Sequence, residues 1–233
     1  MRDAVSNTEW ALQKAPACAK IPAMENLGFK WSTVRRLGIM GGTFDPIHHG
    51  HLVAAEQVRQ GYDLDRVVFI PSGRPPHKVD SEISSAKDRY LMGLLAIIDS
   101  PRFCVSLVEL MREEIAYTID TLRQLRSWTG PRCELYFIAG ADMALDLPTW
   151  RHPDAVLDEC RFIAVERPGY DLASVEQVLG AKRAAKVEVV SAPTPDISAT
   201  DIRKRVAAGK SIAGLTTEPV SQYIAAAGLY ITT

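Results

Sequence analysis

The chain has 233 residues, of which 47% are hydrophobic, and a formal net charge of −1. This length is enough for one substantial core and predicts a single folded domain. The near-neutral charge excludes a general attraction for nucleic acid or for a membrane surface, so any attraction for a polyanionic ligand must be built from residues of a local site.

Cysteine usage and hydropathy exclude several further classes of protein. The four cysteines are widely spaced, with no Cys-x-x-Cys pair and no zinc-ligand spacing, so we expect reduced thiols in a cytoplasmic protein. No stretch holds the roughly eighteen apolar residues that a membrane span needs. Residues 1–34 lack hydrophobic periodicity and the apolar core of a signal peptide, so we expect a disordered extension there and a folded domain at residues 35–233.

The first predicted strand and helix meet at a glycine-rich turn. A short apolar run at residues 37–40 leads into Gly41-Gly42-Thr43-Phe44-Asp45-Pro46-Ile47-His48-His49-Gly50-His51, and a helical pattern follows. Glycines let the backbone approach a ligand, and a helix N-terminus offers unpaired N–H groups, so the turn suits a phosphate. His48 and His51 are three residues apart on one helical face and are expected to reach the same phosphate. His49 is rotated by about 100° and is expected to point elsewhere.

The rest of the chain alternates between predicted strands and helices. Strands are predicted at residues 66–70, 103–107, 134–139, 162–165 and 187–190. Helices are predicted at residues 85–98, 118–125, 175–183, 199–208 and 220–227, and the stripe of the first is Leu91, Leu94, Leu95 and Ile98. Several strands are near-continuous apolar runs, which favours the α/β class: a Rossmann-like, mostly parallel sheet with helices on both faces.

Polar loops follow four of the predicted strands. In an open parallel sheet, ligands bind beyond the carboxyl ends of the strands, where the strand order reverses. The loops at residues 41–51, 74–78, 140–142 and 197–200 would all lie on that rim. Core packing alone does not require four polar loops on one rim, so we expect the ligand site there.

Each candidate in these loops also has a structural interpretation. Lys78 is by default a solvated lysine, but Pro75 and Pro76 stiffen its loop, which favours a phosphate contact. Ser198, with an aspartate three residues later, forms a capping box for the next helix. Arg203 lies about one turn further on, where a guanidinium can clamp a phosphate.

Three further residues stay ambiguous from position alone. Asp142 suits the N-cap of the next helix. Thr118 suits either a helix cap or a ligand contact. Trp150 suits either core packing or stacking on a flat ring.

Two of these motifs together resemble the signatures of the nucleotidyltransferase superfamily. Residues 41–51 contain its H-x-G-H signature, and Ile197-Ser198-Ala199-Thr200-Asp201-Ile202-Arg203 resembles its I-S-S-T-x-x-R signature. Residues 75–78, 117–122 and 140–143, together with Trp150 and residues 167–169, are similar to the bacterial nicotinate-nucleotide adenylyltransferase family. The resemblance covers about residues 35–230. Ala199 stands where the signature usually has a second serine, which removes one hydroxyl from the expected phosphate site.

The resemblance implies a reaction and its reactants. AMP would pass from ATP to nicotinate mononucleotide by direct in-line displacement, giving deamido-NAD and pyrophosphate in NAD biosynthesis. Mg²⁺ would arrive with ATP, and no dedicated protein metal site is expected. ATP and nicotinate mononucleotide are the expected partners, with no nucleic acid and no membrane, and the oligomeric state stays open.

The resemblance also implies roles for individual residues. The catalytic residues would be His48, His51, Lys78 and Arg203. The residues around ATP would be Gly41, Gly42, Thr43, Phe44, His48, His51, Asp142, Ile197, Ser198, Thr200 and Arg203. Nicotinate mononucleotide would contact Asp45, Lys78, Thr118 and Trp150, with Trp150 stacked on the nicotinate ring.

Alternative functions differ in their sequence requirements. Another enzyme of the superfamily, such as pantetheine-phosphate adenylyltransferase, is usually shorter and lacks the Tyr117-Thr118 and Trp150 segments. A non-catalytic nucleotide-binding regulator is disfavoured because both His48 and His51 are present. A dehydrogenase is disfavoured because the first turn lacks Gly-x-Gly-x-x-Gly. The preference for the acid over the amide mononucleotide stays open, since backbone N–H groups can recognise a carboxylate.

Overall fold

A computed structural model describes residues 30–73, 83–166, 172–191 and 193–231. The chain divides into Met1–Lys30 and Trp31–Thr233, and all elements below belong to the second unit. None of the described helices is long and apolar enough to cross a membrane. The predicted extension at residues 1–34 lies mostly outside the described residues; of its last residues, Trp31–Thr33 form a 3-10 helix, η1, whose Trp31 ring lies 5.6 Å from that of Trp128.

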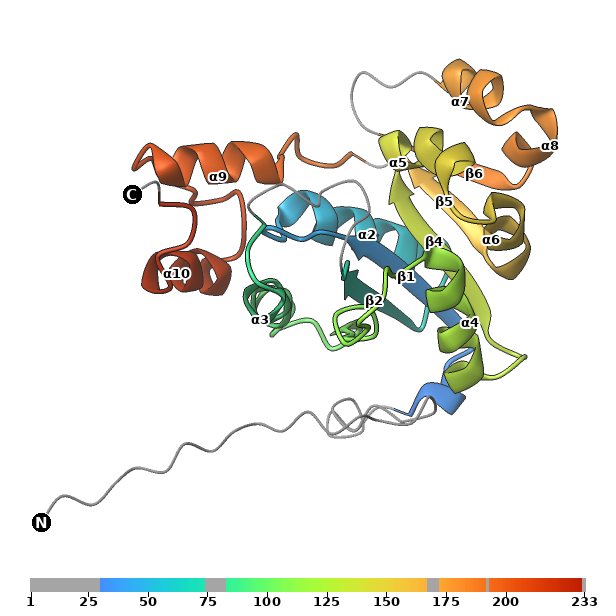
Figure 1. Ribbon diagram of the computed structural model, residues 1–233, viewed down its shortest axis with the longest axis horizontal. Helices are drawn as coiled ribbons and strands as arrows, with labels where there is room; N and C mark the ends of the chain where they lie inside the picture. Colours follow the sequence, from blue (N-terminus) through green and yellow to red (C-terminus); the bar gives the residue numbers. More distant parts are fainter. Residues whose placement is uncertain (1–29, 74–82, 167–171, 192, 232–233) are drawn as a thin grey trace, which may run out of the picture. The chain divides into compact units, whose positions relative to one another are not determined.

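Six parallel strands form one sheet, in the order β3-β2-β1-β4-β5-β6 (Figure 1). The predicted parallel fold is therefore confirmed, and every described strand pairing is parallel. The third strand ends two residues earlier than predicted. The strands are β1 (Arg36–Gly42), β2 (Arg66–Pro71), β3 (Phe103–Val105), β4 (Glu134–Gly140), β5 (Arg161–Val165) and β6 (Val187–Val190).

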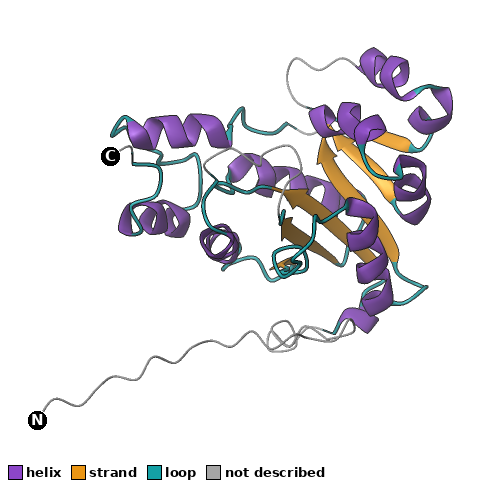
Figure 2. Ribbon diagram, in the orientation of Figure 1, coloured by secondary structure: helices purple, strands orange, loops and turns teal. Residues whose placement is uncertain are grey.

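Helices connect these strands and cover the sheet (Figure 2). Crossovers between parallel strands are right-handed, so the connections that run toward β3 and those that run toward β6 lie on opposite faces. The helices are α2 (His49–Gly61), α3 (Ala86–Ala96), α4 (Thr118–Thr129), α5 (Ala141–Asp146), α6 (Pro153–Glu159), α7 (Leu172–Leu179), α8 (Ala181–Ala184), α9 (Ala199–Ala207) and α10 (Glu218–Ala226), with the 3-10 helix η2 (Leu147–Thr149).

Two helical regions differ from the sequence prediction. The helix predicted at residues 175–183 is divided into α7 and α8 at Gly180, whose φ of 72° is in the left-handed region that favours glycine. In α3 the predicted apolar stripe is confirmed only in part. Leu94 and Leu95 are half-buried and pack against the core, whereas Ile98 lies beyond the end of the helix and is 67% exposed. The fully buried residues of the helix are Arg89, Met92, Gly93 and Ala96. The buried face of α3 therefore includes an arginine.

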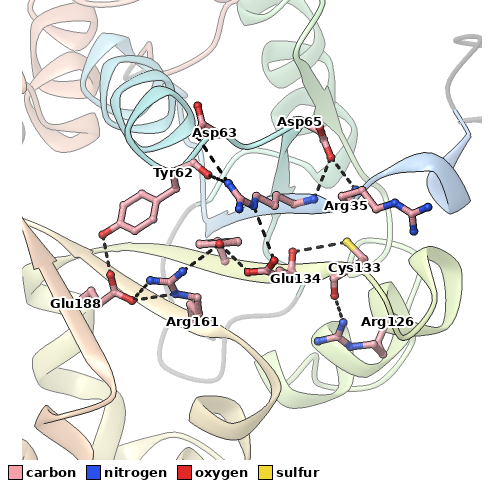
Figure 3. A network of polar contacts seen from close by, with 11 residues as sticks. Arg35, Tyr62, Asp63, Asp65, Arg126, Cys133, Glu134, Arg161 and Glu188 are labelled. Carbon is pink, nitrogen blue, oxygen red and sulfur yellow. Dashed lines mark hydrogen bonds and ion pairs between the residues drawn. The ribbon is translucent and has the colours of Figure 1, made fainter.

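The amino ends of the strands carry a network of paired polar groups (Figure 3). The guanidinium of Arg161 lies 5.1 Å from the ring centroid of Tyr136 and donates to Glu188 at 2.7 Å. Glu188 also accepts a hydrogen bond from the hydroxyl of Tyr62 at 3.0 Å. We call this set the amino-end network: Arg35, Arg36, Tyr62, Asp63, Asp65, Arg126, Cys133, Glu134, Tyr136, Arg161 and Glu188.

Candidate active site

A cavity of about 590 Å³ opens at the carboxyl ends of the strands, where the strand order reverses between β1 and β4. Such a reversal is the usual ligand site of an open α/β sheet. The cavity is lined by residues 40–45, 48, 50, 51 and 54, by residues 138–140, 142 and 143, by residues 194, 195, 197–200 and 203, and by Ile83 and Val165. Three of the four predicted loops therefore meet in one cavity.

Most of the predicted site residues lie in this lining. They are Gly41, Gly42, Thr43, Phe44, Asp45, His48, His51, Asp142, Ile197, Ser198, Thr200 and Arg203. Thr118 and Trp150 are not among the described residues that line the cavity. Lys78 and residues 167–169 lie outside the described part of the chain.

The two imidazoles of the H-x-G-H motif face each other. The rings of His48 and His51 are stacked, with centroids 3.7 Å apart, and His48 is only 2% exposed. The backbone N–H of His48 donates to Nδ1 of His51 at 3.3 Å. A neutral imidazole that accepts at Nδ1 carries its proton on Nε2. His51 is therefore held as a hydrogen-bond donor through Nε2.

Gly50 lies in a narrow space between the histidines. A Cβ at this position would lie 3.0 Å from Nδ1 of His48 and 3.5 Å from the carbonyl oxygen of Pro195. A contact of 3.0 Å is tighter than most side chains show, so a larger residue would require the imidazole of His48 to shift, whereas the contact with Pro195 is an ordinary one.

Phe44 contacts the imidazole of His51. Its φ of +51° is unusual for a residue other than glycine, and this turn places its ring 5.1 Å from His51 in an edge-to-face arrangement. Phe44 is itself buried and packs on Phe69 of β2 at 5.8 Å. The orientation of His51 is therefore fixed by the core.

Asp45 is buried and its carboxylate is already used within the protein. It is 3% exposed; Oδ1 accepts from the hydroxyl of Tyr230 at 2.7 Å, and Oδ2 accepts from the backbone N–H of Ser84 at 3.3 Å. Burial, together with the Asp45 carboxylate, raises the pKa of Tyr230 well above its usual range, so the phenol stays protonated and donates. Asp45 thus joins the H-x-G-H turn to two distant segments.

The start of α9 forms the opposite wall of the cavity. Ser198 is the N-cap, and its hydroxyl accepts from the backbone N–H of Asp201 at 3.0 Å, which confirms the predicted cap. Arg203 donates through Nη1 to the carbonyl oxygen of Asp45 at 2.7 Å and through Nη2 to the hydroxyl of Thr200 at 3.3 Å. The guanidinium is therefore held between the two signature motifs.

Asp142 has a different position from the predicted cap. The N-cap of α5 is Gly140, so the cap interpretation of Asp142 is wrong. Asp142 lines the cavity, and its Oδ1 is buried and has no hydrogen-bond partner among the residues that the structure describes. Such an oxygen is costly to bury unless a ligand supplies a donor.

Trp150 and Thr118 lie in segments that are adjacent to each other. The Trp150 ring packs on Phe137 at 5.7 Å, which supports the core interpretation of this tryptophan. The next residue, Arg151, places its guanidinium 4.4 Å from the ring centroid of Tyr117, the N-cap of α4. Thr118 is the first residue of α4 and not its cap. The contact between Arg151 and Tyr117 brings the two predicted pyridine-binding residues into one region.

Sequence reasoning missed two residues around the cavity, Tyr230 and Arg89. Tyr230 is 185 residues from the aspartate that it contacts, and no local pattern connects them. Arg89 is 3% exposed and donates to four backbone carbonyls around the H-x-G-H turn. A signal existed for Arg89, because it begins an i, i+3, i+4, i+7 series with the buried residues Met92, Gly93 and Ala96.

Comparison with known proteins shows the family of the chain. The cytidylyltransferase-like family matches residues 39–205, which defines the chain as a nucleotidyltransferase. Curated relatives called probable nicotinate-nucleotide adenylyltransferase include one from Thermoanaerobacter sp. (strain X514), 48% identical over 198 residues and covering 84% of this chain and 94% of that protein. Another, from Moorella thermoacetica, is 48% identical and covers 84% of this chain and 91% of that protein.

A solved structure shares the fold. The Plasmodium falciparum nicotinic acid mononucleotide adenylyltransferase complexed with NaAD superimposes with a TM-score of 0.68 and 21% sequence identity, covering 84% of this chain and 97% of that one. With relatives at 48% identity over most of its length, the chain belongs to the nicotinate-nucleotide adenylyltransferase family.

Proposed function

We propose that this protein transfers AMP from ATP to the phosphate of nicotinate mononucleotide, giving deamido-NAD and pyrophosphate in NAD biosynthesis. One observation carries the proposal: in a member of this family, the stacked pair of His48 and His51 shares one cavity with Arg203 at the switch point of the sheet. We also propose a cytoplasmic location, in keeping with the three described cysteines, which are free thiols.

The reaction is a direct displacement at the α-phosphorus of ATP. A phosphate oxygen of the mononucleotide forms a new bond to the α-phosphorus. The bond from that phosphorus to the oxygen that bridges the α- and β-phosphates breaks, and pyrophosphate leaves with its electron pair. Such a transfer needs oriented reactants and compensation of negative charge rather than a protein nucleophile.

His51 and Arg203 supply the charge compensation. His51 carries its proton on Nε2 because Nδ1 accepts from the His48 backbone, so it donates to a phosphate oxygen without rearrangement. The guanidinium of Arg203 is held by Asp45 and Thr200 in a fixed orientation, and the N-terminus of α9 adds a positive dipole end. Together these groups favour the triphosphate.

The remaining cavity residues bind the nucleosides. The Oδ1 of Asp142, to which no described residue donates, is suited to accept a hydrogen bond from a ribose hydroxyl or a base amine. Thr118 and Trp150 are proposed for the nicotinate ring, which requires Trp150 to turn a face of its ring away from Phe137. Lys78 stays a prediction, because it lies outside the described residues.

Mg²⁺ is proposed to arrive with ATP. Among the described residues, no group of three or more His, Cys, Asp or Glu side chains could hold a metal. Mg²⁺ usually binds through substrate phosphates and few carboxylates while keeping several waters. The residues therefore fit a metal bound mainly to ATP, where it would neutralise triphosphate charge.

A substrate panel tests the proposal. The protein is incubated with Mg-ATP and, in separate reactions, nicotinate mononucleotide, nicotinamide mononucleotide or pantetheine phosphate, and pyrophosphate release is measured. We expect the fastest release with nicotinate mononucleotide, together with a dinucleotide of the corresponding mass. Fastest release with pantetheine phosphate would identify another adenylyltransferase, and ATP binding without release would identify a regulator; either result would reject the proposal.

A further inference from the structure

Arg89 on α3 is a buried cation that contacts several loops at once. Its side chain is 3% exposed, in a helix whose other buried positions are Met92, Gly93 and Ala96. Nη1 donates to the carbonyl oxygens of Thr43 at 3.0 Å and Ser72 at 2.7 Å. Nε donates to the carbonyl oxygen of Ser84 at 3.1 Å, and Nη2 reaches that of Gly73 at 3.5 Å.

These four acceptors belong to three different segments. Thr43 is in the turn between β1 and α2 and lines the cavity. Ser72 and Gly73 follow β2, and Ser84 precedes α3. One planar guanidinium therefore connects the H-x-G-H turn to the end of the neighbouring strand and to the start of a helix, with sequence separations of up to 46 residues.

Stability alone does not explain a charge at this position. Burial lowers the pKa of Arg89, with the nearby acidic groups Asp45 and Glu109 opposing that shift. No ion pair to Arg89 is found among the described residues, and its hydrogen bonds go to neutral carbonyls. Burying a guanidinium is costly, and here the cost is offset by donors that are directed at four backbone carbonyls of three segments. An arginine here is therefore better explained by the geometry that it imposes.

That geometry concerns the backbone of Thr43 and Phe44, which line the cavity proposed to bind ATP. In a trans peptide the carbonyl and the following N–H point in opposite directions, so fixing the Thr43 carbonyl also fixes the direction of the Phe44 N–H. Phe44 in turn packs edge-on against His51 at 5.1 Å. Arg89 therefore acts on His51 through two contacts: its hydrogen bond to the Thr43 carbonyl, and the packing of Phe44 on the His51 ring.

We propose that Arg89 is a positioning residue for ATP: it sets the Thr43–Phe44 peptide, and through it His51, in the orientation that binds the triphosphate. The inference rests on the proposed function. A lysine cannot replace the arginine. The four carbonyl oxygens are reached by three nitrogens of one planar guanidinium, and the single nitrogen of lysine cannot contact all of them.

The test compares Arg89 with a matched arginine at the other end of the sheet. Arg126 also donates to backbone carbonyls, those of Cys133 and of Glu159 (2.9 Å), but it belongs to the amino-end network (Figure 3). Arg89→Lys, Arg89→Met and Arg126→Lys are each assayed for thermal unfolding, for binding of a non-hydrolysable ATP analogue, and for the KM of both substrates.

We expect both Arg89 variants to fold and to bind the ATP analogue at least about tenfold more weakly, with KM rising more for ATP than for nicotinate mononucleotide. Arg126→Lys should lower the melting temperature with unchanged analogue affinity. Wild-type affinity in folded Arg89→Met, or an equal loss in Arg126→Lys, would overturn the inference.

A measurement on the wild-type protein covers the case in which the variants do not fold. The Nε–H resonance of Arg89 should shift when the ATP analogue binds, and an unchanged resonance would overturn the inference. If the wild type neither binds the analogue nor releases pyrophosphate, the proposed function itself is wrong; if it does both while Arg89 has no effect, only the role of Arg89 is wrong.

Discussion

The two ends of the sheet differ in how their polar groups are satisfied. At the amino ends, Arg161 pairs with Glu188 at 2.7 Å, and the carboxylate of Asp65 accepts from the backbone of Arg35 at 2.7 Å (Figure 3). At the carboxyl ends, Asp142 keeps a buried oxygen for which the described residues provide no donor. Buried polar groups normally find partners within the protein, so an oxygen without one indicates that a ligand binds there.

The comparison also separates two uses of arginine. At the amino ends, Arg161 is 48% exposed and its partner Glu188 42% exposed, so this pair contributes little to the free energy of unfolding. At the carboxyl ends, Arg89 is buried and Arg203 is held by the backbone of Asp45. Arginines of the first kind belong to the surface of the fold, and those of the second kind shape the site.

The largest effect is expected at the carboxyl end, from His51→Ala. This change removes a donor that the His48 backbone and the Phe44 ring hold in place, and kcat for pyrophosphate release should fall by at least about a hundredfold. The melting temperature should change little, because the His51 ring lies at the cavity. A kcat near that of the wild type would remove His51 from the mechanism.

A smaller effect is expected beside the cavity, from Trp150→Ala. Loss of stacking should raise the KM for nicotinate mononucleotide by about tenfold and leave the KM for ATP nearly unchanged. Some stability should also be lost, because Trp150 packs on Phe137 and Phe162. Equal increases in both KM values would show that Trp150 supports the site only through packing.

Arg161→Ala, at the amino ends of the strands, should lower stability and leave activity unchanged. Loss of the contacts to Glu188 and Tyr136 should lower the free energy of unfolding by about 1 kcal/mol, the usual upper range for an exposed pair. Steady-state kcat should stay unchanged. A clear loss of kcat with unchanged stability would contradict the division between the two ends.

The smallest effect is expected from deleting residues 1–29. The described unit begins at Trp31, which contacts Trp128, so this deletion leaves that contact in place. Both kcat and the melting temperature should equal those of the full chain. A folded but inactive product would show that the extension takes part in the reaction.

Much of the fold was predictable because its signals are local. The strands are apolar runs that the sheet buries on both faces, and the glycine-rich turn with two histidines marks the first strand-to-helix junction. The short helix α6 escaped prediction, and α5 was expected only from the cap interpretation of Asp142, since six and seven residues do not show helical periodicity over two full turns. The six-strand order was not predictable from local pattern.

The site was predictable only where it follows sequence motifs. The residues of both signatures line the cavity, but Arg89, Tyr230 and the role of Gly140 as the cap of α5 were missed. Each of these depends on contacts between distant segments or on a polar residue in an otherwise apolar stripe. No local pattern marks Tyr230, because tertiary packing decides its contact, whereas the only signal for Arg89 is its place in the series with Met92, Gly93 and Ala96.

The central claim is that the cavity lets one bound substrate attack the other directly. The most direct measurement uses ATP with a chiral α-thiophosphate and determines the configuration at that phosphorus in the dinucleotide product. A single in-line displacement predicts inversion of configuration. Retention would require two displacements through a covalent enzyme intermediate and would contradict the account.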